Sequence, residues 1–174
     1  MLAYVFFHRA APGVEIDAYE AALRRFHSSL AGEPPPGFGG STTYRINGGY
    51  ADWYLVENSA ALDPLNEAAV SAARLASHDA VAHMSADGAG KLLALVSGRP
   101  ASDPGFEIRL SKPKGMTYPD FYRRLEPWTS RGDVSLWRRM MVLGPPPEFC
   151  LVAPPSHLQL PAALTPEAVQ RTPI

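Results

Sequence analysis

Residues 41–57, STTYRINGGYADWYLVE, decide how this chain folds. The segments 41–46 and 52–57 are rich in β-branched and aromatic residues, which favour strands. Between them, Asn47-Gly48-Gly49 consists of the residues typical of a tight hairpin turn. The stretch therefore predicts two antiparallel strands that are consecutive in the chain.

The sequence on either side of this hairpin predicts further elements. Residues 3–9, AYVFFHR, predict a strand, and a helix follows with Asp17 as its N-cap, because Glu20 stands at the capping-box distance. A long helix is expected over 63–86, ended by Gly88 and Gly90, with a strand at 91–96. The predicted order, β-α-β-β-α-β, is that of a ferredoxin-like unit.

The second half of the chain repeats this pattern in shortened form. A strand is predicted at 106–111 and a helix capped by Thr117 after it. Ser135-Leu136-Trp137-Arg138 corresponds to Thr42-Thr43-Tyr44-Arg45, and Glu148-Phe149-Cys150-Leu151-Val152 corresponds to Asp52-Trp53-Tyr54-Leu55-Val56. A Pro-rich tail follows, in which a short strand is expected at His157 to Leu160 and a short helix from Thr165. We therefore predict a complete unit at 1–98, a linker at 99–105 and a shortened second unit at 106–174.

These repeated motifs give the chain a resemblance to the dimeric α+β barrel superfamily, in a fused form. The resemblance implies an α+β fold in which two ferredoxin-like units lie in tandem, with antiparallel sheets packed face to face and helices outside. The superfamily includes small-molecule monooxygenases, isomerases, haem-dependent enzymes and domains of other roles, so the fold leaves function open. No cofactor is predicted for this chain, and the resemblance leaves haem open.

Three classes of function remain after this reading. The first is an enzyme with a pocket between the sheets, such as a cofactor-independent oxygenase or isomerase that acts on an aromatic or polyketide-like compound. The second is a ligand-binding or regulatory domain without catalysis. The third is a structural or interaction protein whose barrel is filled with side chains. An enclosed pocket with converging polar groups would favour the first two.

Candidate ligand-binding residues follow from the expected inner faces of the two sheets. Glu107 and Arg109 alternate with Phe106, Ile108 and Leu110, so the apolar set should meet the helices and the polar set the space between the sheets. Aligning the repeats places His8 opposite Arg109 on the same inner face. The aromatic pairs at corresponding repeat positions complete the expected lining: Tyr44 with Trp137, and Trp53 with Phe149.

His78 is the other catalytic candidate, beside His8. It lies in Ser77-His78-Asp79-Ala80-Val81-Ala82-His83, where Asp79 and His83 are four residues apart and can face each other on a helix. Histidine titrates near neutral pH and can act as a general base. The alternatives are a polar helix surface for this segment and a hydrogen-bonded structural histidine for His8. No metal site is predicted, because no Cys/His cluster supplies further ligands.

Composition limits the partners and the compartment. The net charge of −1 provides no long-range attraction for nucleic acid or an anionic membrane. It conceals an asymmetry, since residues 1–98 carry about −4 and residues 99–174 about +3. The single cysteine, Cys150, and the short apolar stretch at the start of the chain predict a cytoplasmic protein. The helix missing from the second unit would leave a surface that a homodimer could cover.

Overall fold

The computed structural model describes residues 1–155 and 160–174 of the chain. Its elements in chain order are β1 (Leu2–Ala10), α1 (Ile16–Gly32), β2 (Phe38–Ile46), β3 (Gly49–Val56), η1 (Ser59–Ala61), α2 (Leu62–Ala69), α3 (Leu75–Met84), β4 (Ser85–Ser97), β5 (Gly105–Leu110), α4 (Tyr118–Thr129), β6 (Ser135–Arg139), β7 (Phe149–Ala153), η2 (Ala162–Leu164) and β8 (Glu167–Pro173). The strands expected on either side of the 47–49 turn are confirmed as β2 and β3, each beginning three residues earlier than predicted.

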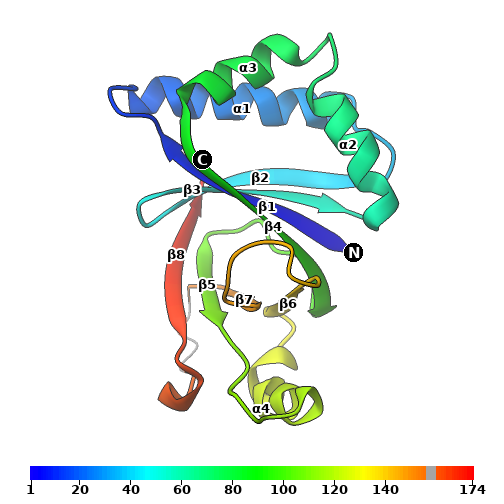
Figure 1. Cartoon of the computed structure of the whole chain (residues 1–174), viewed down its shortest axis with the longest axis vertical. Helices are drawn as coiled ribbons and strands as arrows, with labels where there is room; N and C mark the ends of the chain where they lie inside the picture. Colours follow the sequence, from blue (N-terminus) through cyan, green and yellow to red (C-terminus); the bar gives the residue numbers. More distant parts are fainter. Residues whose placement is uncertain (156–159) are drawn as a thin grey trace.

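The eight strands form one closed antiparallel barrel in the order β1-β3-β2-β8-β5-β7-β6-β4 (Figure 1). This closure differs from the expected pair of separate sheets, because two pairings join their edges. On one side β8 lies between β2 and β5, and on the other β4 pairs with β6. Residues 167–173 therefore form a strand where a short helix was expected. The short strand predicted at His157 to Leu160 falls mostly outside the described residues.

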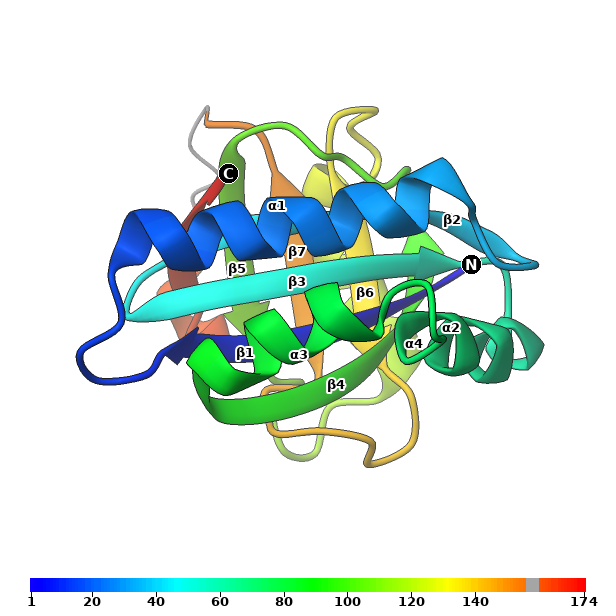
Figure 2. The ribbon, with the colours of Figure 1, turned by 90° about the horizontal axis from the view of Figure 1, so that it is seen from above.

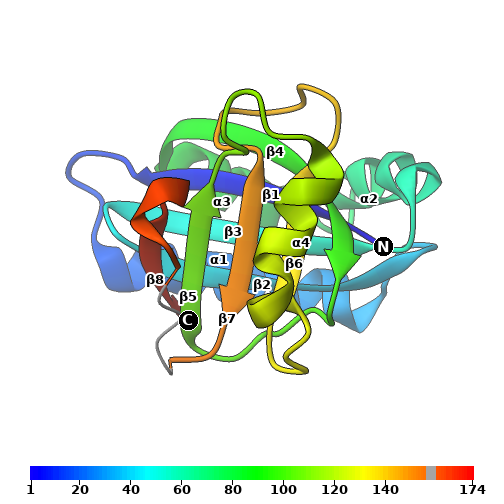
Figure 3. The same cartoon turned by 90° about the horizontal axis from the view of Figure 1, so that it is seen from below.

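Helices cover the barrel on two opposite sides. The helices α1, α2 and α3 lie over the outer face of β1 to β4 (Figures 1 and 2). Helix α4 covers the face formed by β5, β7 and β6 (Figure 3), where Phe121 and Leu125 pack against Ile108 and Leu110. The apolar side of the strand at 106–111 therefore meets a helix, as its alternation predicts. The tandem division at 98 and 105 remains a prediction.

The inside of the barrel is packed mainly with apolar side chains. Val5, Trp53, Leu93, Trp137 and Val152 belong to one buried cluster there. Trp53 and Trp137 meet edge to face, with ring centroids 5.4 Å apart. A filled interior of this kind stabilises the fold by removing large aromatic surfaces from water.

The single long helix predicted over 63–86 is wrong. The chain instead forms α2 and α3, separated by a turn at residues 70–74, and continues directly into β4 at Ser85. Arg74 stabilises this turn from a buried position. Its guanidinium donates to the backbone oxygen of Ser29 at 3.1 Å and to that of Glu33 at 2.6 Å, at the end of α1.

Gly88 and Gly90 lie within β4 and do not end a helix. A Cβ at Gly88 would lie 2.7 Å from Cζ of Phe6, and one at Gly90 would lie 2.6 Å from Oη of Tyr4. The two glycines are therefore needed because the rings of β1 lie directly over β4. At the ends of helices, the predicted cap at Thr117 is confirmed, as its hydroxyl accepts from the Asp120 amide. Asp17 is not an N-cap, because α1 begins one residue before it.

None of the helices in the described part of the chain is both long and apolar enough to cross a bilayer.

Candidate active site

A pocket of about 680 Å3 lies outside the barrel, between the helices and the sheet. The helices α2 and α3 form one side of it, and the outer face of β1, β3 and β4 forms the other. Its walls are largely apolar and aromatic, with Tyr4, Phe6, Phe26 and Tyr54 among the lining residues. A volume of this size accommodates a drug-sized molecule.

The expectation that the main pocket lies between the sheets is wrong. Tyr44, Trp53 and Trp137 do face the interior, but the cavity that they line holds only about 240 Å3. Arg109 lines another cavity, of about 320 Å3, at one end of the barrel. The interior is smaller than the helix-covered pocket because large aromatic side chains from both halves fill it.

His8 and Phe149 do not lie where the repeat alignment placed them. His8 stands on the outer face of β1, beneath the helices, whereas Arg109 points into the barrel and binds Glu107 at 2.9 Å. Phe149 packs against α4 and not beside Trp53. The alignment was wrong for these residues because it assumed that the same positions of both copies turn the same face inward. The ligand-binding roles of Tyr44, Trp53, Trp137 and Arg109 remain predictions.

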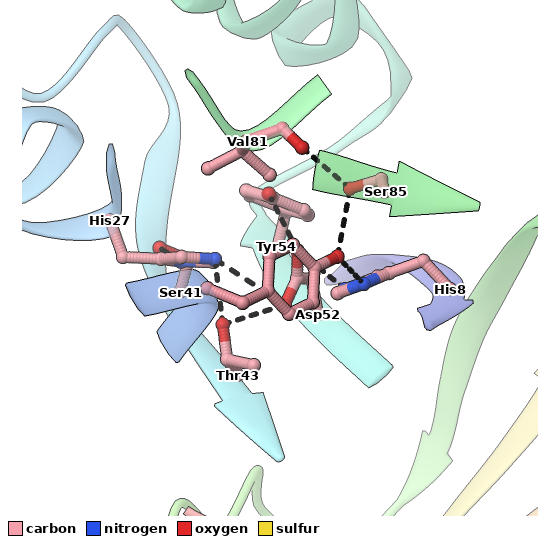
Figure 4. Close-up of polar contacts among 9 residues, drawn as sticks. His8, His27, Ser41, Thr43, Asp52, Tyr54, Val81 and Ser85 are labelled. Carbon is pink, nitrogen blue, oxygen red and sulfur yellow. Dashed lines mark hydrogen bonds and ion pairs between the residues drawn. The ribbon is translucent and has the colours of Figure 1, made fainter. Parts of the chain in front are cut away.

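A buried carboxylate, Asp52, forms the polar floor of the large pocket. The residue is 2% exposed and lies on β3, between the inward-facing Ala51 and Trp53. Thr43 donates to its Oδ1 at 2.6 Å, and Tyr54 donates to its Oδ2 at 3.3 Å. Two histidines flank it: His8 Nε2 lies 3.2 Å from Oδ2 and His27 Nε2 lies 3.5 Å from Oδ1 (Figure 4).

Aromatic rings hold both histidines in place. The imidazole of His8 is stacked between Phe6 and Tyr50, with centroid distances of 5.3 and 5.6 Å. His27 is stacked on Tyr54 at 5.1 Å. Side chains packed in this way lose little further freedom on ligand binding, so the site is preorganised.

The direction of the hydrogen bonds fixes the tautomer of His27. Thr43 uses its only hydroxyl proton on Asp52, so it must accept from His27 Nε2, which lies 2.9 Å away. His27 Nε2 therefore carries a proton. Its Nδ1 lies 2.6 Å from Ser41 Oγ, a group that can either donate or accept.

The same reasoning assigns two protons to His8. Ser85 Oγ donates to the backbone oxygen of Val81 at 2.8 Å, so Tyr19 Oη must donate to Ser85 at 2.7 Å. Tyr19 then has to accept from His8 Nδ1, 2.5 Å away. Because Nε2 of His8 faces the Asp52 carboxylate, a proton there is favourable and a lone pair is not. In this arrangement His8 and Asp52 form a buried ion pair.

Two groups of this cluster, Asp52 and Tyr19, have pKa values shifted from the ordinary range. Burial alone would raise the pKa of Asp52, but the hydrogen bonds from His27 and His8 outweigh burial and hold it well below its usual range. Burial raises the pKa of Tyr19 to about 12, so this phenol keeps its proton at neutral pH. The floor of the pocket therefore presents a fixed carboxylate surrounded by donors.

His78 lies on the opposite wall of the pocket, on α3. Its Nδ1 is 3.1 Å from Asp79 Oδ1, and its ring meets Phe26 edge to face at 5.9 Å. A carboxylate on Nδ1 favours a proton on that nitrogen and leaves Nε2 as the acceptor. Asp79 therefore orients His78, and the expected pairing of Asp79 with His83 is replaced by this contact with its immediate neighbour.

The sequence reading missed Asp52, His27 and Tyr54. In the sequence, Asp52 begins a repeated motif, and a carboxylate inside the apolar run ADWYLV is itself a signal of a buried polar site. A buried acid requires partners, which could have directed attention to the histidines. His27 carried no comparable signal, because only the packing of α1 on β2 and β3 brings it to Asp52.

The pocket does not fit a haem group. Its lining includes the carboxylates of Asp52 and Asp87 and, among the described residues, neither lysine nor arginine. Haem carries two propionate groups, which such a lining would repel and not bind. Among residues 1–155 and 160–174, no group of three or more His, Cys, Asp or Glu side chains is placed to hold a metal ion.

The fold is an α+β barrel of eight antiparallel strands, and it is similar to that of a solved structure. One similar solved structure is that of the chlorite dismutase-like protein TA0507. It matches with a TM-score of 0.60 and 11% sequence identity, over 99% of this chain and 94% of that one. This likeness concerns the fold alone. No family model and no curated protein matches the chain.

Proposed function

We propose that this protein is an enzyme that removes a proton from a small, ring-containing compound bound in the helix-covered pocket. Proton abstraction is a first step that many isomerases share with cofactor-independent oxygenases. The observation that carries the proposal is a single one: an oriented histidine and a buried carboxylate cluster lie on opposite sides of a pocket of about 680 Å3.

In this proposal His78 is the general base. Asp79 accepts from its Nδ1, which leaves Nε2 free to take a proton from the bound compound. The side chain of His78 is 37% exposed, so it can return the proton to solvent after the reaction. A group of this kind typically accelerates proton transfer by about 10²–10⁴-fold.

The floor of the pocket would bind the polar end of the compound. The oxygens of Asp52 are already occupied by its partners, but the hydroxyl of Tyr54, which donates to Asp52, also lines the pocket and can accept a hydrogen bond from a hydroxyl or amide group. The aromatic residues Tyr4, Phe6 and Phe26 would contact the rings. This combination favours an aromatic or polyketide-like compound over a highly charged one.

Exchange of substrate protons with solvent deuterium tests the proposal directly. α-Tetralone, a bicyclic aromatic ketone with slowly exchanging protons beside its carbonyl, serves as the probe. We expect the protein to accelerate exchange, and His78→Ala to lower the acceleration by about 100-fold, the contribution of a general base. The reaction is followed by mass spectrometry.

His83→Ala is the matched control, because His83 is exposed on the same helix and does not line the pocket. This variant should catalyse proton–deuterium exchange of α-tetralone as fast as the wild type. Equal rates for His78→Ala and wild type would contradict the role of His78. Binding of α-tetralone without exchange would favour a ligand-binding domain, and no binding at all would favour a structural role.

A further inference from the structure

The cavity that Arg109 lines lies at one end of the barrel and shares only Asp87 with the large pocket among its described lining residues. It holds about 320 Å3 and is lined by Phe7, Lys91, Arg109 and the prolines 145–147. None of these residues takes part in the proposed proton transfer. The cavity therefore calls for a separate explanation.

Lys91 is the unusual residue of this cavity. It is only 6% exposed, and its ammonium donates to the backbone oxygen of Pro147 at 3.2 Å. Within the described part of the chain, no carboxylate lies within ion-pair distance of it. A buried ammonium without a counterion is costly, and it retains further N–H donors for a ligand.

Arg109 supplies a second cationic group. It donates to Glu107 through Nε at 3.2 Å and through Nη2 at 2.9 Å, which leaves Nη1 available for another acceptor. The Lys91 ammonium and the Arg109 guanidinium both lie by the ring of Phe7, at 5.6 and 5.0 Å from its centroid. The cavity thus combines an apolar ring with two cationic donors.

The negative groups of the cavity are either paired or at its rim. Asp87 binds Arg9, and both side chains are more than half exposed. Glu167 begins β8 and is exposed. Neither group neutralises the buried ammonium. Gly144 (φ 110°) keeps the loop against Lys91, because a Cβ there would lie 2.6 Å from the Lys91 Cα.

We propose that this cavity binds a small organic carboxylate, with the anionic group between Lys91 and Arg109 and the apolar part against Phe7. Lys91 and Arg109, which would hold the anion, take no part in the proposed proton transfer, although His8 of the Asp52 cluster also borders this cavity. The pKa of Lys91 is lowered, mainly because the ammonium is buried, and a bound anion would oppose that shift.

Calorimetric titration with benzoate tests this assignment, with benzyl alcohol as the uncharged probe of similar shape. We expect benzoate to bind the wild type at least tenfold more tightly than benzyl alcohol. Lys91→Met should lower benzoate affinity at least tenfold and leave that for benzyl alcohol unchanged. Equal binding of the two probes, or unchanged benzoate binding by Lys91→Met, would overturn the proposal, as would no binding of benzoate.

Lys112→Met is the matched control. Lys112 also lies over an aromatic ring, Tyr118 at 5.3 Å, and donates to backbone oxygens, but it does not line the cavity. This variant should bind benzoate like the wild type. If Lys91→Met does not fold, the Lys91 ammonium resonance of the wild type provides the second measurement. A shift with benzoate but not with benzyl alcohol supports the site, and no shift with either rejects it.

Discussion

Asp52 shows how one buried charge can organise a whole site. Thr43, Tyr54, His8 and His27 all lie around its carboxylate. A charge removed from water is tolerated only with close partners. The hydrogen-bond donors that the Asp52 carboxylate requires therefore determine the tautomer of His27 and the charge of His8. The same group keeps both imidazoles beside the pocket, where a ligand can reach the floor that they support.

Replacing Asp52 by Asn should lower the free energy of unfolding by about 3 kcal/mol near pH 6, because it leaves the charge of His8 unpaired. The pKa of Asp52 is lower in the folded than in the unfolded state, so its contribution is complete above a pH of about 4 and decreases as the pH falls below that value. Urea unfolding at several pH values measures the difference.

Asp103→Asn is the control for this change, since Asp103 is exposed in the segment between β4 and β5. It should alter stability by less than about 0.5 kcal/mol. A loss for Asp52→Asn that stayed constant from pH 6 to pH 3 would contradict the ion pair.

At the scale of elements, the break between α2 and α3 shapes the pocket. A continuous helix over 63–86 would replace two helices of different direction that together form one wall (Figure 1). Arg74 holds the break by binding backbone oxygens at the end of α1. These oxygens at a helix C-terminus have no partner within the helix, so an arginine satisfies them particularly well.

Arg74→Met should lower the free energy of unfolding by about 2 kcal/mol, because it leaves these oxygens without their charged donor. It should also weaken ligand binding in the large pocket, because α2 and α3, which form one wall of that pocket, would be held less firmly. Chemical unfolding and hydrogen exchange of the α3 amides measure the two effects. Arg25→Met, on the exposed side of α1, is the control and should change neither. Equal behaviour of the two variants would argue against a role of Arg74 in the turn.

At the scale of the whole molecule, β8 closes the barrel. It pairs with β2 through Tyr44 and Arg45 and with β5 along residues 105–109. Arg171 projects from β8 into the interior, 2% exposed, with its guanidinium 4.2 Å from the centroid of the Tyr44 ring. The end of the chain thus seals the two sheets and supplies a buried cation to the space between them.

Ending the chain after Leu164 should expose the edges of β2 and β5 and admit water to Trp53. We expect faster hydrogen exchange in both strands and a red shift of tryptophan fluorescence. Arg171→Met is a milder variant that keeps the strand, and it should lower stability by about 2 kcal/mol without opening those edges. Unchanged exchange in β2 and β5 after truncation would contradict closure by β8.

The strands and the covered faces of this fold could be predicted from local pattern. The alternation in residues 106–111 correctly assigned Ile108 and Leu110 to the helix-covered side, because period-two alternation depends only on the geometry of a strand. The hairpin turn at 47–49 could also be predicted, because its signal lies in three consecutive residues. His78 was identified as a candidate from its residue type and its place on a helix, and it lines the large pocket.

The sequence by itself thus determined most of the strands and helices, but neither the break at 70–74 nor the strand at 167–173, and it identified His78 but not Asp52 or His27. Only the tertiary structure decided that β8 closes the barrel, that Asp52 binds two histidines from different elements, and that the main pocket lies under the helices. The physical reason is the range of the interactions. Periodicity and turns act between neighbours in the chain, whereas burial of Asp52 and filling of the interior depend on segments that meet only after folding.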